Sequence, residues 1–271
     1  MRILVTNDDG INAPGIKILN QIALELAGPH GEVWLVAPES EQSGVGHCIN
    51  YINPTRVSKV SDQKIAIQGS PADCVLAGLH YISRNGKPDL ILSGINKGNN
   101  SGENTIYSGT VGAAMEGALQ GIRSIALSQY YGPENIKLEN PFEAASRFGG
   151  SLIMDIFKKA NWGGAGYKTF YNVNFPPVQS RNVQGIRVVS QGLRNTKFNV
   201  EPTTAPNGRD FLWIKGNRQD IPTEIGTDVH ANLNGYISVT PMTCNLTNYE
   251  LLDDLKKNLE CEKESIKTQR K

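Results

Sequence analysis

Short hydrophobic runs alternate with amphipathic stretches over residues 1–160 of the chain. The runs over residues 2–6, 32–38, 64–68, 89–93 and 122–127 predict buried strands. Between them, hydrophobic residues recur at helical spacing over 16–26, 110–119 and 142–156, and Ser70-Pro71-Ala72-Asp73 forms a capping box that opens a further helix. This alternation predicts an α/β fold with a mainly parallel sheet and helices on both of its faces.

The pattern changes after about residue 165. Four short segments at 170–175, 186–189, 211–214 and 236–240 resemble strands separated by Gly, Pro and Asn. They predict β-rich excursions on the same core, so that residues 1–246 form a single α/β catalytic domain. The capping box Thr247-Asn248-Tyr249-Glu250 then precedes four leucines and predicts a final helix. We expect residues 247–271 to be this helix and a polar tail, with 263–271 as a solvated terminus.

Composition restricts the classes of partner. The formal net charge of +1 argues against bulk attraction to a nucleic-acid polymer or a membrane surface. No apolar stretch approaches the roughly 20 residues that cross a bilayer, and Asp8 and Asp9 come before any signal-peptide core could form. The four cysteines lack CxxC spacing, which suits reduced thiols in a cytoplasmic protein.

Two adjacent carboxylates, Asp8 and Asp9, follow the first predicted strand. The carboxyl ends of parallel strands form the edge where ligands bind in open α/β folds. Adjacent like charges raise one another's pKa, and a hard divalent cation such as Mg²⁺ would relieve the repulsion. A plain strand-to-helix turn accounts for the same residues equally well, since Asp, Asn and Gly favour turns.

Two further loops carry oxygen ligands or phosphate donors. Ser43-Gly44 follows the second strand, and a polar Gly/Asn-rich stretch over 94–109, expected to be a loop, contains Asn96 and Asn100. Ser108-Gly109-Thr110 comes directly before a helix of small residues, whose amino terminus is suited to phosphate. Each segment alone also fits a flexible polar loop or a simple helix cap. Together they favour a metal-dependent phosphate site.

Other familiar motifs are absent from the sequence. It contains no GxxxxGK[ST] phosphate loop, no G-x-G-x-x-G after the first strand and no G-x-S-x-G elbow. The four histidines show no metal-ligand spacing. Only His47, near the second loop, is a candidate for a catalytic or substrate-binding role.

The sequence resembles the SurE family of survival-protein nucleotidases. The segments that carry the resemblance are 1–16, 36–44, 69–75, 93–100, 107–117, 227–228 and 235–241. They span nearly the whole chain in the expected order, and the match is strongest in residues 1–130 and looser between about 130 and 225.

The resemblance implies a Rossmann-like three-layer α/β/α core and hydrolysis of nucleoside 5′-monophosphates, and of 3′-monophosphates as well. It implies one divalent metal ion per subunit, Mg²⁺ or Mn²⁺, with the ligands Asp8, Asp9, Ser43 and Asn96. The phosphate-side residues that it implies are Asn100, Ser108, Gly109 and Thr110. It also implies a homodimer or homotetramer with exchanged carboxyl-terminal segments, for which the helix over 247–259 is the candidate.

In one loop the sequence departs from the family pattern. Residues 39–43 read Glu-Ser-Glu-Gln-Ser, with acids and Gln where many relatives carry an Asp and basic residues. The charge near the substrate therefore differs, while the predicted Ser43 ligand is retained.

The mechanism that we expect is attack on phosphorus by a metal-activated water, which Asp8 or Asp9 orients or deprotonates. Attack by a carboxylate to give an aspartyl phosphate is the competing mechanism. A phosphoacceptor receiver domain also has an acidic pair after its first strand, but it is much shorter, and the long Asn/Gly loop with Ser108-Gly109-Thr110 would have no role in it. A catalytically silent nucleotide-binding protein that uses the same pocket is the alternative to an enzyme.

Overall fold

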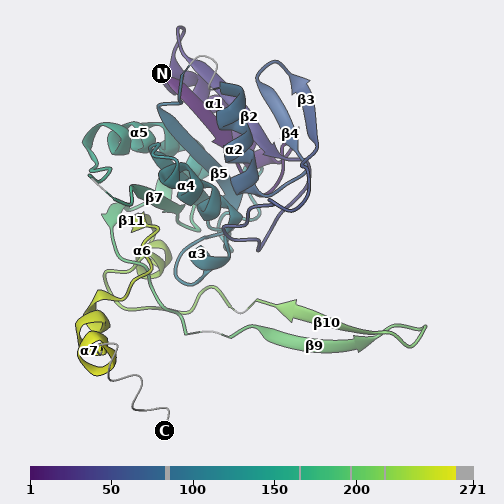
Figure 1. Ribbon diagram of the computed structural model, residues 1–271, viewed down its shortest axis with the longest axis vertical. Coiled ribbons are helices and arrows are strands. Elements are labelled where there is room, and N and C mark those ends of the chain that lie inside the picture. Colours follow the sequence, from purple (N-terminus) through teal and green to yellow (C-terminus); the bar gives the residue numbers. More distant parts are fainter. Residues whose placement is uncertain (83–85, 165, 196, 217, 261–271) are drawn as a thin grey trace.

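A single mixed sheet forms the centre of the molecule. The computed structural model describes residues 1–82, 86–164, 166–195, 197–216 and 218–260. The nine strands of the sheet lie in the order β3-β4-β2-β1-β5-β6-β7-β11-β8 (Figure 1). Their bounds are β1 (Arg2–Thr6), β2 (Glu32–Pro38), β3 (Val57–Ser61), β4 (Lys64–Ile67), β5 (Leu90–Lys97), β6 (Ser124–Gln129), β7 (Thr169–Phe175), β8 (Gly185–Val188) and β11 (Tyr236–Thr243).

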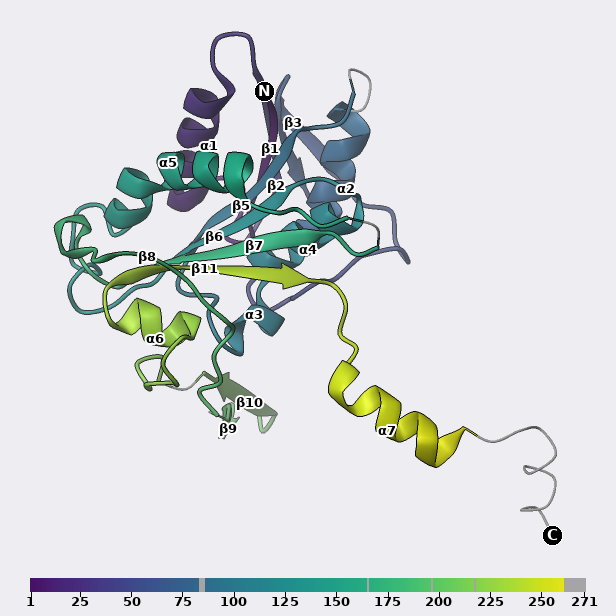
Figure 2. The same cartoon turned by 90° about the vertical axis from the view of Figure 1, so that its left-hand side faces the viewer.

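Most neighbouring strands of this sheet are parallel, as predicted. Only the β3–β4 and β7–β11 pairs are antiparallel. The helices are α1 (Pro14–Ala27), α2 (Pro71–Ile82), α3 (Asn104–Tyr107), α4 (Gly109–Leu119), α5 (Glu143–Lys159), α6 (Asp228–Leu233) and α7 (Tyr249–Leu259), with a 3₁₀ turn at Ser180–Asn182. Figure 2 shows α1 and α5 on one face of the sheet and α2 and α4 on the other. The predicted three-layer α/β/α architecture is confirmed.

The apolar core forms on both faces of the central strands. Ile3 and Val5 of β1 face a cluster with α1 and α5, whereas Leu4, between them, packs with residues of β4 and α2. This alternation follows from the two-residue period of a strand. Because β1 is buried on both faces, its carboxyl end is held rigidly, and that end carries Asp8 and Asp9.

Local signals explain where several helices begin. The predicted capping box of α2 is present: the Ser70 nitrogen donates to Asp73 Oδ2 at 2.9 Å, and the Asp73 nitrogen donates to Ser70 Oγ at 3.1 Å. The final helix, α7, is present as predicted, but its cap is Asn248 rather than Thr247. Asn248 Oδ1 accepts from the nitrogens of Glu250 and Leu251 at 3.1 and 3.4 Å.

The loop predicted over 94–109 is wrong in part. Strand β5 continues to Lys97 through an irregularity between Ser93 and Asn96, and the short helix α3 follows. Gly94 makes this possible, because its φ is +135° and a Cβ there would lie 2.2 Å from the Leu127 carbonyl oxygen. Helix α4 also begins one residue before the predicted Thr110.

Two strands were not predicted from the sequence. The residues of β3 are mostly exposed and lie at the sheet edge, so no buried apolar face marks them. Strand β9 (Asn199–Thr204) pairs with β10 (Asp210–Lys215) in a separate hairpin, which contains the predicted strand at 211–214. Figure 1 shows this hairpin extending away from the main sheet.

The carboxyl-terminal segment extends away from the sheet. Figure 2 shows α7 reached by a linker from the end of β11. The division into a catalytic domain over 1–246 and an appended segment over 247–271 stays a prediction, and the predicted tail at 263–271 lies outside the described residues. Among the helices that the structure describes, none is both long and apolar enough to cross a bilayer.

Candidate active site

Asp8 lies beyond the end of β1 and points at the amino terminus of α4. The residue is only 4% exposed. Thr110 donates two hydrogen bonds to it, from its nitrogen to Oδ2 at 3.1 Å and from its hydroxyl to Oδ1 at 2.5 Å. Burial is the main cause that raises the pKa of Asp8 to about 6, and the charge of Asp9 adds to it, while the Thr110 hydrogen bonds oppose the rise. The pKa of Asp8 is thus much closer to neutral pH than that of an ordinary aspartate.

Asp9 is less buried and faces the end of β5. The Lys97 nitrogen donates to Asp9 Oδ2 at 3.0 Å, which places Asp9 beside the Asn96-Lys97 segment. Burial raises the pKa of Asp9, and the charge of Glu41 raises it further. Burial, with the nearby charge of Asp9, likewise raises the pKa of Tyr131 to about 12. Tyr131 therefore stays a neutral phenol beside the acidic pair.

The loop after β2 packs against both Asp8 and α4. The Gln42 nitrogen donates to the Asp8 carbonyl at 2.7 Å. Ser43 therefore directly follows a residue that contacts the acidic pair. The Ser43 hydroxyl donates to Glu41 Oε1 at 2.7 Å. Further along, the Gly46 nitrogen donates to the Tyr107 carbonyl at 3.0 Å. A Cβ at Gly112 would lie 2.4 Å from the Gly46 carbonyl oxygen, so this glycine allows the loop to lie on the helix.

The segment after Gly94 brings two predicted asparagines to the same edge. Asn96 Nδ2 donates to the Gly98 carbonyl at 3.0 Å. The side-chain oxygen of Asn96, Oδ1, takes no part in that hydrogen bond. Asn100 is held from β6 and β7: its nitrogen donates to Asn174 Oδ1 at 2.7 Å, and its Nδ2 donates to Ser128 Oγ at 2.8 Å. The position of Asn100 is therefore set by side chains that project from neighbouring central strands.

Three of the four residues predicted on the phosphate side, Ser108, Gly109 and Thr110, lie at the cap and start of α4, but their contacts differ. Ser108 is the cap, and its Oγ accepts from the Val111 nitrogen at 3.1 Å. A Cβ at Gly109 would lie 2.9 Å from Asp8 Cβ, so this position is directly against the acid. Both donors of Thr110 are used by Asp8. The helix amino terminus thus stabilises a protein carboxylate as well as offering its remaining amides to a ligand.

The candidate metal ligands are suited to a hard cation. Asp8, Asp9, Ser43 and Asn96 would offer carboxylate, hydroxyl and amide oxygens, which Mg²⁺ and Mn²⁺ prefer. Within the described residues, no group of three or more His, Cys, Asp or Glu side chains is placed to hold a metal ion. The buried Asp8 carboxylate with its raised pKa supports the fit, because a cation would compensate a charge that burial makes unfavourable.

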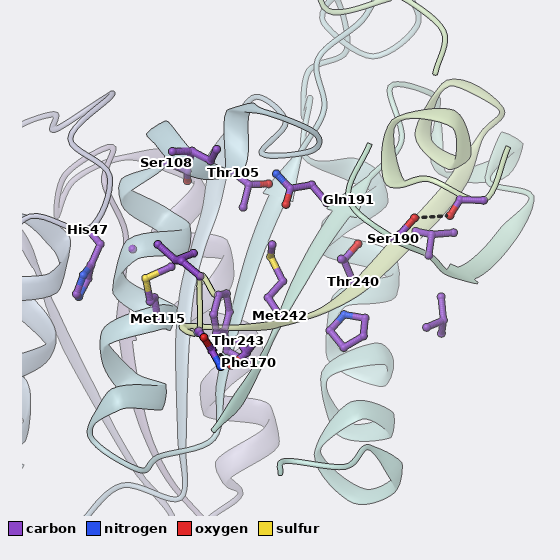
Figure 3. A pocket seen from close by; sticks show the side chains of 18 residues that line it. His47, Thr105, Ser108, Met115, Phe170, Ser190, Gln191, Thr240, Met242 and Thr243 are labelled. Atoms are coloured by element: carbon purple, nitrogen blue, oxygen red, sulfur yellow. Dashed lines mark hydrogen bonds between the residues drawn. The ribbon is translucent and has the colours of Figure 1, made fainter. Parts of the chain in front are cut away.

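His47 lies apart from the acids, against the middle of α4. Its Nε2 is 2.7 Å from Oε2 of Glu116, a side chain 6% exposed that also accepts from Gln120. His47 lines a cavity of about 950 Å³ between α4 and β11, which neither Asp8 nor Asp9 lines. Figure 3 shows His47 and Met115 on one side of this cavity and Thr240 on the other. The structure gives His47 a partner on α4 and no contact with the acidic pair.

Sequence reasoning missed the residues that support the Asn100 loop. Asn172 Nδ2 donates to the Asn100 carbonyl at 2.8 Å, and Asn232 Nδ2 donates to the Asn174 carbonyl at 3.0 Å. Asp228 accepts from the Gly102 and Gly192 nitrogens at 3.0 and 2.8 Å. Two asparagines on one face of the otherwise apolar strand β7 were the available signal, because a buried amide needs polar partners.

The chain is similar to known proteins over nearly its whole length. A family model described as "Survival protein SurE" matches residues 3–198. The chain belongs to the SurE family. A "5'-nucleotidase SurE" of Jannaschia sp. (strain CCS1) is 58% identical over 263 residues, covering 96% of this chain and 100% of that protein. The "5'-nucleotidase SurE" of Roseobacter denitrificans is 57% identical over 94% of this chain and 98% of its own length.

Among solved structures, the SurE protein from Aquifex aeolicus superimposes with a TM-score of 0.76 at 38% identity, covering 96% of this chain and 100% of that one. The family membership predicted from the sequence motifs is therefore confirmed across nearly the whole chain. The α/β architecture is confirmed with it.

Proposed function

We propose that this SurE family member is a metal-dependent phosphomonoesterase, which hydrolyses nucleoside 5′-monophosphates, and 3′-monophosphates as well, to nucleoside and phosphate. The enzyme class predicted from the sequence, a 5′-nucleotidase and hence a hydrolase, agrees with the names of its relatives. The observation that carries the finer proposal is the buried Asp8 carboxylate, which lies beside Asp9 and against the first turn of α4.

Asp8, Asp9, Ser43 and Asn96 would hold one Mg²⁺ or Mn²⁺ ion. The chemistry that such an ion supplies is polarisation of the phosphoryl oxygens and a lower pKa for water. Asp9 is the better candidate for orienting the attacking water, because only its Oδ2 is engaged, by the Lys97 nitrogen. Thr110 donates a hydrogen bond to each carboxylate oxygen of Asp8, so the negative charge of Asp8 would be held in a fixed position beside the ion.

The phosphate group would lie at the amino terminus of α4. Gly109 offers one of the first helical amides, which have no partner within the helix, and Ser108 keeps its hydroxyl proton as a donor. We place Asn100 and Thr110 in this subsite too, with Thr110 acting through Asp8. Such donors stabilise the charge that develops on the equatorial oxygens during attack by water.

The proposed role of Asp8 as a metal ligand disfavours the aspartyl-phosphate route. Thr110 takes one lone pair on each Asp8 oxygen, and a carboxylate whose remaining lone pairs bind a cation is a poorer nucleophile. The alternative of a catalytically silent nucleotide-binding protein uses the same pocket and differs only in turnover.

We also propose that the protein acts in the cytoplasm as a homodimer or homotetramer with exchanged carboxyl-terminal segments. Leu251, Leu255 and Leu259 on α7 are 62%, 54% and 68% exposed, and these side chains need a partner surface. Cys48, Cys74 and Cys244 are free thiols, which suits a reducing compartment.

The experiment that tests the proposal is phosphate release from a panel of 5′- and 3′-nucleoside monophosphates. The wild-type protein is stripped of metal and assayed with Mn²⁺, Mg²⁺ or EDTA, beside Asp9→Asn and a matched variant of a distant acid, Asp62→Asn. We expect metal-dependent release that Asp9→Asn loses and Asp62→Asn keeps. Absence of release from folded wild-type protein with every metal would instead indicate the silent binding protein.

A further inference from the structure

The acidic loop over residues 39–43 contains one carboxylate that the proposed function leaves unused. Glu41 accepts the hydroxyl proton of Ser43, with Ser43 Oγ 2.7 Å from Glu41 Oε1. Both side chains are exposed, so packing does not force this contact. It lies beside Gln42, whose nitrogen is bonded to the Asp8 carbonyl. The carboxylate is therefore next to the candidate metal ligands without being among them.

The direction of the hydrogen bond determines what Ser43 can do. A serine hydroxyl has one proton and two acceptor lone pairs. Because the proton is directed to Glu41, the lone pairs of Ser43 Oγ are free to face another group. A carboxylate that accepts the proton of a metal-ligating side chain fixes the orientation of that side chain. It also makes the ligating oxygen a better electron-pair donor to a cation.

The charge of Glu41 acts in the same direction. It is close enough to Asp9 to contribute to the raised pKa of that acid, so it adds negative charge around the carboxylate pair. Glu39, two residues earlier, is different: its Oε2 is 2.7 Å from Arg56 Nη2, and its Oε1 accepts from the Ser58 hydroxyl at 2.7 Å. The two acids of this loop thus have separate partners, and of the two only the charge of Glu41 acts on the pKa of Asp9.

We infer that Glu41 is a positioning residue that accepts the Ser43 proton, so that the Ser43 oxygen presents its lone pairs to a divalent cation held with Asp8, Asp9 and Asn96. The inference rests on the proposed metal site and adds to it a residue of the surrounding shell. It also gives a role to the acid by which this loop departs from the pattern of many relatives.

The test is the affinity for Mn²⁺, measured by titration calorimetry on full-length, metal-stripped protein. We expect Glu41→Ala to weaken Mn²⁺ binding about 10- to 100-fold, the usual effect of losing such a support. Glu41→Gln keeps an acceptor oxygen and should retain most of the affinity. Glu39→Ala is the matched control in the same loop and should bind Mn²⁺ like the wild type.

The Ser43→Ala background separates positioning from a general charge effect. Once Ser43 is removed, Glu41→Ala should cost much less affinity than it does in the wild-type background. The inference is overturned if Glu41→Ala binds like the wild type, if Glu41→Gln loses as much as Glu41→Ala, or if the loss persists undiminished in Ser43→Ala. Thermal melts show whether each variant is folded, and the exposed position of Glu41 makes folding the expected result.

The same experiment distinguishes failure of the inference from failure of the proposed function. If the wild type binds no Mn²⁺, or if Asp9→Asn binds it equally well, the proposed metal site is wrong and the role of Glu41 falls with it. If the wild type binds Mn²⁺, Asp9→Asn does not, and Glu41→Ala is unaffected, only the role of Glu41 is wrong.

Discussion

Thr110 donates both its backbone nitrogen and its hydroxyl to the carboxylate of Asp8, at 3.1 and 2.5 Å. The two residues are 102 positions apart in the sequence, and their contact joins the end of β1 to the first turn of α4. Asp8 thereby occupies the partly positive end of a helix, which favours its charged form. Burial favours its neutral form and prevails, since the pKa of Asp8 is raised to about 6.

Removal of the Thr110 hydroxyl should shift the pH dependence of Mn²⁺ binding to higher pH. Thr110→Val keeps the side-chain shape and the backbone bond but loses the bond to Asp8 Oδ1. Because that bond favours the carboxylate, its loss raises the pKa of Asp8 in the metal-free protein further. A cation must displace the proton of Asp8, so we expect the Mn²⁺ affinity at pH 6.5, measured by titration calorimetry, to fall about 10-fold, with recovery at higher pH. Thr203→Val on the exposed hairpin is the control, and an unshifted pH dependence of Mn²⁺ affinity in Thr110→Val would contradict the assigned role.

Asp8→Asn should stabilise the metal-free protein while abolishing turnover. The pKa of Asp8 rises from 3.8 to about 6 on folding, so its charged form destabilises the fold at neutral pH. This loss in the free energy of unfolding is absent below pH 3.8, grows between pH 3.8 and about 6, and reaches its full size above pH 6. Its full size is about 3 kcal/mol.

Urea unfolding in EDTA at several pH values measures this effect. The free energy of unfolding of Asp8→Asn should exceed that of the wild type at pH 8, and the two should converge at pH 4. A difference independent of pH would show that the carboxylate charge is not its source. Mn²⁺ should narrow the difference at pH 8, because only the wild type gains stability from the ion.

Gly109→Ala should inactivate the protein even though alanine is a better helix former. A Cβ there would lie 2.9 Å from both Asp8 Cβ and Pro71 Cγ, so Asp8 or the helix start must move. Gly150 in α5 is the matched control, since a Cβ there has no neighbour closer than 3.7 Å. Gly150→Ala should raise the free energy of unfolding by about 1 kcal/mol and leave activity intact. Equal activity in both variants would refute the close packing of Gly109 on Asp8.

Local signals were sufficient to locate the acidic pair and the start of α2. Asp8 and Asp9 follow an apolar run, and the Ser70–Asp73 capping box acts within four residues, so both can be read from adjacent positions. The edge of the sheet then follows from parallel pairing, because strand ends gather there.

The support of the site could not be predicted in the same way. Asn174 reaches the nitrogen of Asn100, 74 residues away, and His47 meets Glu116 across 69 residues. Such contacts depend on which strands become neighbours and on how a loop lies on a helix, which no local period encodes. The position of β5 beyond Ser93 was missed for the same reason, since it depends on the fit of Gly94 against Leu127.

His47→Ala should loosen the loop that carries Ser43. The hydrogen bond from His47 is the main cause that lowers the pKa of Glu116, so the pair stabilises the fold above the ordinary pKa of a glutamate. We expect a loss of about 1 to 3 kcal/mol in the free energy of unfolding at pH 7. The loss should shrink as the pH falls and Glu116 becomes protonated. A double-mutant cycle with Glu116→Gln measures the coupling free energy between the two side chains. A coupling of zero would show that the His47–Glu116 pair does not hold this loop on α4.

Removal of the final helix tests the proposed exchange of carboxyl-terminal segments. The exposed leucines of α7 gain a buried surface only if another subunit supplies it, so truncation after residue 246 should lower the molar mass in light scattering to that of a smaller assembly. Truncation after Glu260 removes the tail but keeps α7 and is the matched control. If both truncated proteins assemble like the full chain, the subunits associate through other surfaces. If only the longer one does, α7 holds the assembly together, and phosphate release from the shorter protein then shows whether the active site is complete within one subunit.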